Sequence, residues 1–100
     1  MTFNVSCYWA DNCASYDISI DVSSVDELLE QMEGIFEEAC GITAVEGFYI
    51  ECGDREDMYP YEWDNEDLRR NRDLSDVWNK ERKNIKEYFG KVFDTHEDQK

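Results

Sequence analysis

The sequence predicts an α+β fold: a small antiparallel three-stranded sheet with one amphipathic helix packed on it, followed by a long C-terminal helix. Two segments near the N-terminus alternate between apolar and polar residues, as strands do. Two later segments repeat apolar residues at steps of three and four, as helices do. A chain of 100 residues forms one domain. We assign this domain to residues 1–93 and expect residues 94–100 to be a flexible polar tail.

The first two strands are predicted over residues 2–9 and 16–22, joined by a turn-rich segment at residues 11–15. In both strands one parity is mostly apolar and the other is mostly polar. The residues expected to face inward are Phe3, Val5, Cys7, Trp9, Tyr16, Ile18, Ile20 and Val22.

The first helix is predicted over residues 24–40. Ser24 can cap it, with Glu27 completing a capping box, and Gly41 can adopt the left-handed conformation that ends many helices. The exposed face of this helix is a row of carboxylates without any cation, although like-charge neighbours cost a few tenths of a kcal/mol each. The row consists of Asp26, Glu27, Glu30, Glu33, Glu37 and Glu38.

A third strand is predicted over residues 43–52, with a bulge at Gly47 because Val45 falls on the opposite parity. Residues 53–64 are expected to be a loop that carries Met58, Tyr59, Tyr61 and Trp63. Its aromatic residues either fold back on the core as a lid or stand exposed as anchors for a partner.

The remainder of the chain is predicted to be helical. A short turn begins at Asp64 and runs through Leu68, and a long helix follows a cap at Asp73. Its apolar positions are Leu74, Val77, Trp78, Ile85, Tyr88, Phe89 and Val92.

The charge is large and unevenly distributed. The net charge is −15, whereas a small domain ordinarily carries a magnitude of about 2–8. Residues 1–68 hold 18 acidic side chains against Arg55 alone, a net −17, and residues 69–100 carry a net +2. Direct binding to nucleic acid or to an anionic membrane would need cations on the binding surface. The expected partner is therefore a basic protein surface.

The residues offer little for catalysis or metal binding. The only histidine, His96, lies in the predicted tail, and there is no glycine-rich phosphate loop. The spacings of Cys7, Cys13, Cys40 and Cys52 do not match the paired ligands of zinc sites. The acidic segment 54–67 lacks the pattern of an EF-hand loop. We therefore expect no enzymatic activity, no cofactor and no resident metal.

No signal sequence or membrane-length apolar run is evident, so we expect a cytoplasmic protein with reduced cysteines.

The acidic surface allows several interpretations. It can be an ordinary solvated face or an adaptation to high salt. In either case the acidic residues would be spread over the whole chain. The acidic residues are instead concentrated in the first two-thirds of the chain. This distribution indicates a surface complementary to a cationic groove, in which the carboxylates take the place of nucleic-acid phosphates. The residues expected to bind the partner are Asp26, Glu27, Glu30, Glu33, Glu37, Glu38, Asp54, Glu56, Asp57, Tyr59, Tyr61, Glu62, Trp63, Asp64, Glu66 and Asp67, with Asp17 and Asp21 beside them.

In charge and size the chain resembles the small acidic inhibitors that phages and mobile elements make against host nucleases, the DNA-mimic anti-restriction and anti-CRISPR proteins. It is similar, at the same level, to acidic immunity proteins that plug a basic nuclease toxin. These proteins share no sequence pattern, so no motif residue carries over. The resemblance implies that the chain blocks the nucleic-acid groove of a host defence nuclease. The alternative is an interaction module or immunity protein that binds through the aromatic loop 58–63 without mimicry.

Overall fold

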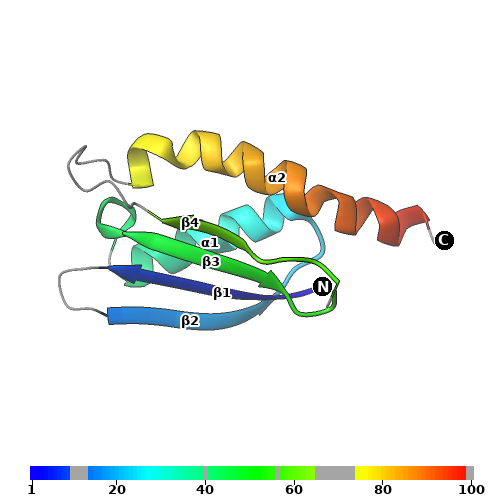
Figure 1. Cartoon of the computed structure of the whole chain (residues 1–100), viewed down its shortest axis with the longest axis horizontal. Coiled ribbons are helices and arrows are strands. Elements are labelled where there is room, and N and C mark those ends of the chain that lie inside the picture. The colour runs from blue at the N-terminus through cyan, green and yellow to red at the C-terminus, as the bar shows by residue number, and fades with distance from the viewer. Residues whose placement is uncertain (10–13, 40, 56, 65–73, 99–100) are drawn as a thin grey trace.

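The computed structural model describes residues 1–9, 14–39, 41–55, 57–64 and 74–98. It has an antiparallel four-stranded sheet and two long helices, so the α+β prediction is confirmed (Figure 1). The order of the strands in the sheet is β2-β1-β3-β4. The elements are β1 (Thr2–Trp9), β2 (Ala14–Asp21), α1 (Val25–Ala39), the 3-10 helix η1 (Ile42–Ala44), β3 (Gly47–Cys52), β4 (Tyr61–Asp64) and α2 (Leu74–Asp98).

The prediction of three strands is wrong, because the sheet has a fourth strand, β4, where we expected the end of a loop. Its sequence Y-E-W-D alternates as a strand does, but four residues after a proline gave too short a pattern to identify. The third strand is also shorter than predicted. Residues 42–44 form η1, which leaves Val45 buried, and β3 begins at Gly47 without the expected bulge.

Both helices contribute to one core on the same face of the sheet. The ring centroids of Phe3 on β1 and Phe89 on α2 lie 5.2 Å apart. The ring of Phe48 on β3 lies 5.6 Å from Phe36 on α1 and 6.2 Å from Trp78 on α2. Contacts of this kind bury apolar side chains of both helices, and no described element packs on the other face of the sheet (Figure 1).

The ends of α1 follow from local chemistry. Ser24 Oγ accepts a hydrogen bond from the backbone N–H of Glu27 at 3.1 Å, as a capping residue does. The Glu27 carboxylate accepts hydrogen bonds from the N–H and the hydroxyl of Ser23, one residue earlier than in a capping box. Gly41 has a φ of 87°, and its N–H donates to the Phe36 carbonyl at 2.8 Å.

Helix α2 continues to Asp98, so the backbone of residues 94–98 is helical. The flexibility predicted for residues 94–100 stays a prediction. The predicted cap at Asp73 and the turn leading to Leu68 lie outside the described residues.

Candidate partner-binding surface

The acidic row of α1 is divided between two environments. Asp26 Oδ1 lies 3.3 Å from Lys86 Nζ, and Glu33 Oε1 lies 3.5 Å from Arg82 Nη1. The indole N–H of Trp78 donates to the same Glu33 oxygen at 2.7 Å. Asp26 and Glu33 are two helical turns apart and thus lie on the flank of α1 that meets α2. We call Asp26, Glu33, Trp78, Arg82 and Lys86 the interhelical seam; its carboxylates are matched by the protein's own cations.

The other carboxylates of α1 point elsewhere. The Glu27 carboxylate binds Ser23 just before the helix, and Glu37 Oε1 accepts a hydrogen bond from the N–H of Ile42 at 3.3 Å. Glu30 and Glu38 line a groove between α1 and β2. Among the described residues, no cation forms an ion pair with these four carboxylates.

The aromatic loop is mostly packed on the core. Tyr61 and Trp63 belong to β4, and their rings stack on Phe48 with centroids 6.2 and 5.8 Å away. The hydroxyl of Tyr61 donates to Glu81 at 2.6 Å; burial and this carboxylate raise the pKa of Tyr61 above its usual value. Tyr59 differs, because it is 82% exposed. Of the three aromatic anchors expected, Tyr59 is the one that is fully available to a partner.

The open face of the sheet carries a second group of carboxylates. Because side chains alternate along a strand, the pairing register places these residues on the face opposite the core. One cross-strand row runs from Asp17 through Ser6 and Tyr49 to Glu62. We call the carboxylates of this side the acidic sheet face: Asp17 and Asp21 on β2, Glu51 on β3, and Glu62 and Asp64 on β4.

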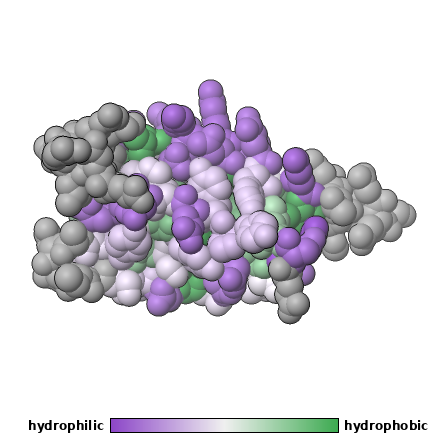
Figure 2. All heavy atoms as spheres, in the orientation of Figure 1, coloured by the Kyte–Doolittle hydropathy of each residue, from purple (hydrophilic) through white to green (hydrophobic). Residues whose placement is uncertain are grey.

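The acidic sheet face is accessible to solvent. Asp17, Asp21, Glu62 and Asp64 are exposed, and Glu51 is half-buried. Figure 2 shows this side of the molecule, with hydrophilic side chains set among side chains of intermediate hydropathy over the strands. Within the described part of the chain, the one cation paired with this face is the amino group of Met1, 3.1 Å from Asp21 Oδ1.

The carboxylates lie mainly on the two outer strands. Asp17 and Glu62 are separated by three interstrand steps, which corresponds to about 14 Å at about 4.8 Å per step. The major groove of B-DNA, which the phosphates border, is about 12 Å wide. The two acidic borders of the sheet are therefore separated by a distance comparable to that between the phosphate borders of a DNA groove.

Hydrogen bonds position the central carboxylate of this face. Ser19 Oγ donates to Asn4 Oδ1 at 2.6 Å, and Asn4 Nδ2 donates to Glu51 Oε1 at 3.2 Å. The hydroxyl of Tyr49 donates to the other oxygen of Glu51 at 3.1 Å. Desolvation and this carboxylate raise the pKa of Tyr49. The network holds Glu51 in one orientation between the two acidic borders.

Tyr8 lies across Gly47 and reaches Asp64. A Cβ atom built on Gly47 would lie 2.3 Å from the Tyr8 ring, so only glycine leaves room for this arrangement. The Tyr8 hydroxyl hydrogen-bonds the Asp64 carboxylate. Burial, followed by this bond, raises the pKa of Tyr8 from 10.0 to about 12. A phenol of ordinary pKa is already protonated at neutral pH, so this shift matters only in alkaline solution.

Sequence reasoning missed Tyr8, Tyr49 and Glu51 as members of this site. Strand alternation already placed Tyr8 on the outward parity of β1. The missing information was the register, which sets Glu51 opposite Asn4 and Glu62 opposite Tyr49. Register is a property of strand pairing and is not written in any one strand.

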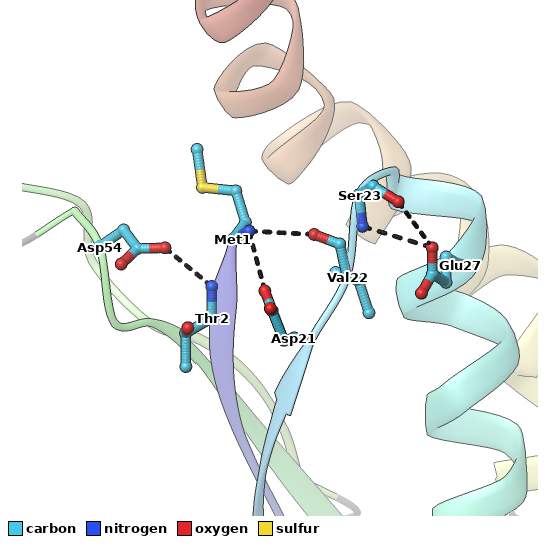
Figure 3. Close-up of polar contacts among 7 residues, drawn as sticks. All are labelled: Met1, Thr2, Asp21, Val22, Ser23, Glu27 and Asp54. Atoms are coloured by element: carbon cyan, nitrogen blue, oxygen red, sulfur yellow. Dashed lines mark hydrogen bonds and ion pairs between the residues drawn. The ribbon is translucent and has the colours of Figure 1, made fainter.

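Other predicted acidic residues have local roles. Asp57 forms an ion pair with Arg55 at 3.1 Å, and the guanidinium holds the pKa of Asp57 below its usual value. Asp54 accepts a hydrogen bond from the N–H of Thr2 at 2.7 Å. Figure 3 shows this bond beside those from Met1 to Asp21 and from Ser23 to Glu27. Glu56, Glu66 and Asp67 lie outside the described residues.

No group of three or more histidine, cysteine or acidic side chains with metal-binding geometry occurs among the described residues. None of the described helices is long and apolar enough to span a membrane. Comparison with family models, with curated proteins and with solved structures gave no match for this chain.

Proposed function

We propose that the protein is a small acidic inhibitor that mimics the phosphate charge of nucleic acid. In this proposal it occupies the basic nucleic-acid-binding groove of a defence nuclease in the cytoplasm, as the inhibitors encoded by phages and mobile elements do. The protein has no enzymatic role of its own. The observation that carries the proposal is the acidic sheet face, where four of five carboxylates have no ion pair with a cation of the described residues.

Two further features support binding by this face. Its outer strands, which hold most of the carboxylates, lie about 14 Å apart, comparable to the width of a DNA groove. Tyr8 and Tyr49 lie between them and offer aromatic surface, while their hydroxyls are engaged by Asp64 and Glu51. Charge complementarity mainly accelerates association, and aromatic contacts add affinity once the surfaces meet. The combination suits a groove lined with arginine and lysine.

The experiment is competition for DNA. A panel of purified restriction endonucleases and RNA-guided nucleases is titrated with the protein, and binding of a fluorescent duplex is followed by anisotropy. For at least one nuclease we expect competitive displacement of the duplex that weakens as salt rises from about 50 to about 200 mM. Absence of displacement across the panel, or displacement insensitive to salt, would contradict the proposal.

A pair of triple variants locates the surface. D17N/E62Q/D64N removes three charges from the acidic sheet face and should reduce inhibition about ten- to hundred-fold, since charge steering changes association rates by 10- to 1,000-fold. D26N/D57N/E87Q removes the same charge from exposed positions elsewhere, two of which are already paired with cations. It should inhibit like the wild type. Equal loss in both variants would mean that net charge, and not its placement, determines binding.

A second candidate function is binding of a partner through the aromatic loop, which the exposure of Tyr59 favours. In that case Tyr59→Ala should abolish capture of the partner, and salt should have little effect. Trp63→Ala is the less informative test, because Trp63 stacks on Phe48 and its loss would disturb the core.

A further inference from the structure

Strand β2 forms a free edge of the sheet. It is eight residues long and pairs with β1 on one side, and no described residue pairs with its other side (Figure 1). Its outer edge therefore presents backbone N–H and C=O groups that no described strand pairs with. Such an edge is a template for a further strand unless a protein covers or disrupts it.

The helix side of this edge is incompletely covered. Ile18 and Ile20 are half-buried, although their cross-strand neighbours Val5 and Phe3 are fully buried. The difference arises because α1 leaves the outer strand partly uncovered. A groove of about 440 Å³ lies between α1 and β2, and we call it the β2 groove. It is lined by Ile18, Ile20, Glu30, Gln31, Gly34, Ile35 and Glu38.

Gly34 keeps the β2 groove open. It lies in the middle of α1, where glycine costs about 1 kcal/mol relative to alanine. No atom lies within 4 Å of a Cβ built at this position, so close packing does not require glycine there. A side chain at position 34 would instead project beside the apolar floor of the groove.

The charges around the edge determine which strand can bind. Asp17 and Asp21 lie on the open side of β2, and Glu30 and Glu38 lie on the helix side. Pairing with β2 of a second copy would bring aspartates of both copies together, which is unfavourable across a strand pair. A strand with lysine or arginine meets opposite charge instead.

We propose that the edge of β2 and the β2 groove together bind an extended basic segment of a partner protein by strand addition. Main-chain hydrogen bonds join the segment to β2. Its apolar residues cover Ile18 and Ile20, and its alternate lysine or arginine residues face Asp17 and Asp21. This site shares Asp17 and Asp21 with the acidic sheet face, but it is formed by the edge of β2 and the β2 groove and does not require nucleic-acid mimicry.

The probe for this site is a capped eight-residue peptide of alternating valine and lysine. A second peptide with the same sequence carries N-methyl groups on every other residue, on the edge that would face β2. The N-methylated peptide keeps the charge and side chains but cannot form the ladder. Amide exchange and ¹⁵N chemical shifts of the protein are measured during titration with each.

We expect the first peptide to protect every second amide of β2 from exchange and to bind at least tenfold more tightly than its N-methylated form. Equal affinity of the two peptides, or shifts that bypass β2, would overturn the proposal. Protection of β2 that rises with protein concentration in the absence of peptide would also overturn it, because a second copy would then occupy the edge.

Two glycine variants test the groove. Gly34→Gln places a side chain in it and should weaken peptide binding several-fold, whereas Gly90→Gln changes a glycine of α2 that also has no neighbour within 4 Å. Gly90→Gln should bind the peptide like the wild type. Equal affinity of both variants would show that the peptide avoids the groove and would overturn the proposal.

Neither peptide result depends on whether a nuclease is inhibited, so the two proposals can fail separately.

Discussion

The interhelical seam and the acidic sheet face contain similar side chains in opposite situations. In the seam, Asp26 and Glu33 meet Lys86 and Arg82 from α2. On the sheet, Asp17, Glu62 and Asp64 meet no cation of the described residues. The sequence distributes its acidic residues over both, and only the packing of α2 against α1 separates them. The comparison teaches that a high negative charge in the sequence does not define a negative surface.

The seam also has a structural function that the sheet face lacks. Trp78 is 6% exposed, and its indole N–H would lose its partner without Glu33. The ion pairs themselves are exposed, with side-chain accessibilities of 40% for Glu33 and 59% for Lys86, and such pairs contribute about 0–1 kcal/mol. Folding therefore explains the position of Glu33, whereas it does not explain the exposed carboxylates of the sheet.

The largest expected effect comes from the core against which the interhelical seam packs, on the side of the sheet opposite the acidic sheet face. Phe48 is 1% exposed and contacts Trp78 of the seam as well as Trp63 of β4. Phe48→Ala should lower the free energy of unfolding by about 3–5 kcal/mol, as large-to-small changes in a core do. Urea denaturation measures this. Tyr49→Ala changes the next residue, which lies on the open face, and should cost far less; equal losses would mean that the two faces of the sheet contribute alike to stability.

A smaller effect is expected within the seam. Glu33→Ala removes the acceptor of the Trp78 indole and should destabilise the protein by about 1–3 kcal/mol, the cost of an unpaired buried donor. Glu33→Gln keeps an acceptor oxygen and loses only the exposed ion pair with Arg82, so its cost should be below about 1 kcal/mol. Urea denaturation of the two variants shows whether the hydrogen bond or the charge of Glu33 contributes more to stability. A larger loss of stability in Glu33→Gln than in Glu33→Ala would show that the charge contributes more.

The smallest effect concerns Tyr8 on the sheet. Below pH 10 its phenol is protonated in both the folded and unfolded protein. Between pH 10 and about 12 the unfolded chain releases this proton while the folded protein keeps it, so the free energy of unfolding falls over that window. In Tyr8→Phe the fall should be shallower. Chemical denaturation at several pH values measures the difference, and identical slopes would show that folding does not raise the pKa of Tyr8.

Sequence reasoning predicted the parts of the fold that depend on local pattern. The alternation in residues 2–9 and 16–22 identified β1 and β2, and the capping residue Ser24 marked the start of α1. Strand β4 was missed because four residues after Pro60 carry too little pattern to outweigh the appearance of a loop.

The site was less predictable for a physical reason. Nothing in the sequence places Lys86 beside Asp26, since 60 residues separate them and the contact depends on how two helices pack. Likewise, Tyr8 reaches Asp64 only because Gly47 lies between them in the register. Composition predicted that the protein would be acidic, and tertiary structure determined which carboxylates remain available.

The most direct test of this account is a map of where a cationic probe binds. Hexa-arginine is titrated into ¹⁵N-labelled protein at low salt, and amide shifts are followed residue by residue. We predict that the largest shifts fall on β2, β3 and β4 around Asp17, Glu51, Glu62 and Asp64, with small shifts along the interhelical seam. Shifts concentrated on α1 at Asp26 and Glu33, with the sheet unchanged, would contradict the central claim.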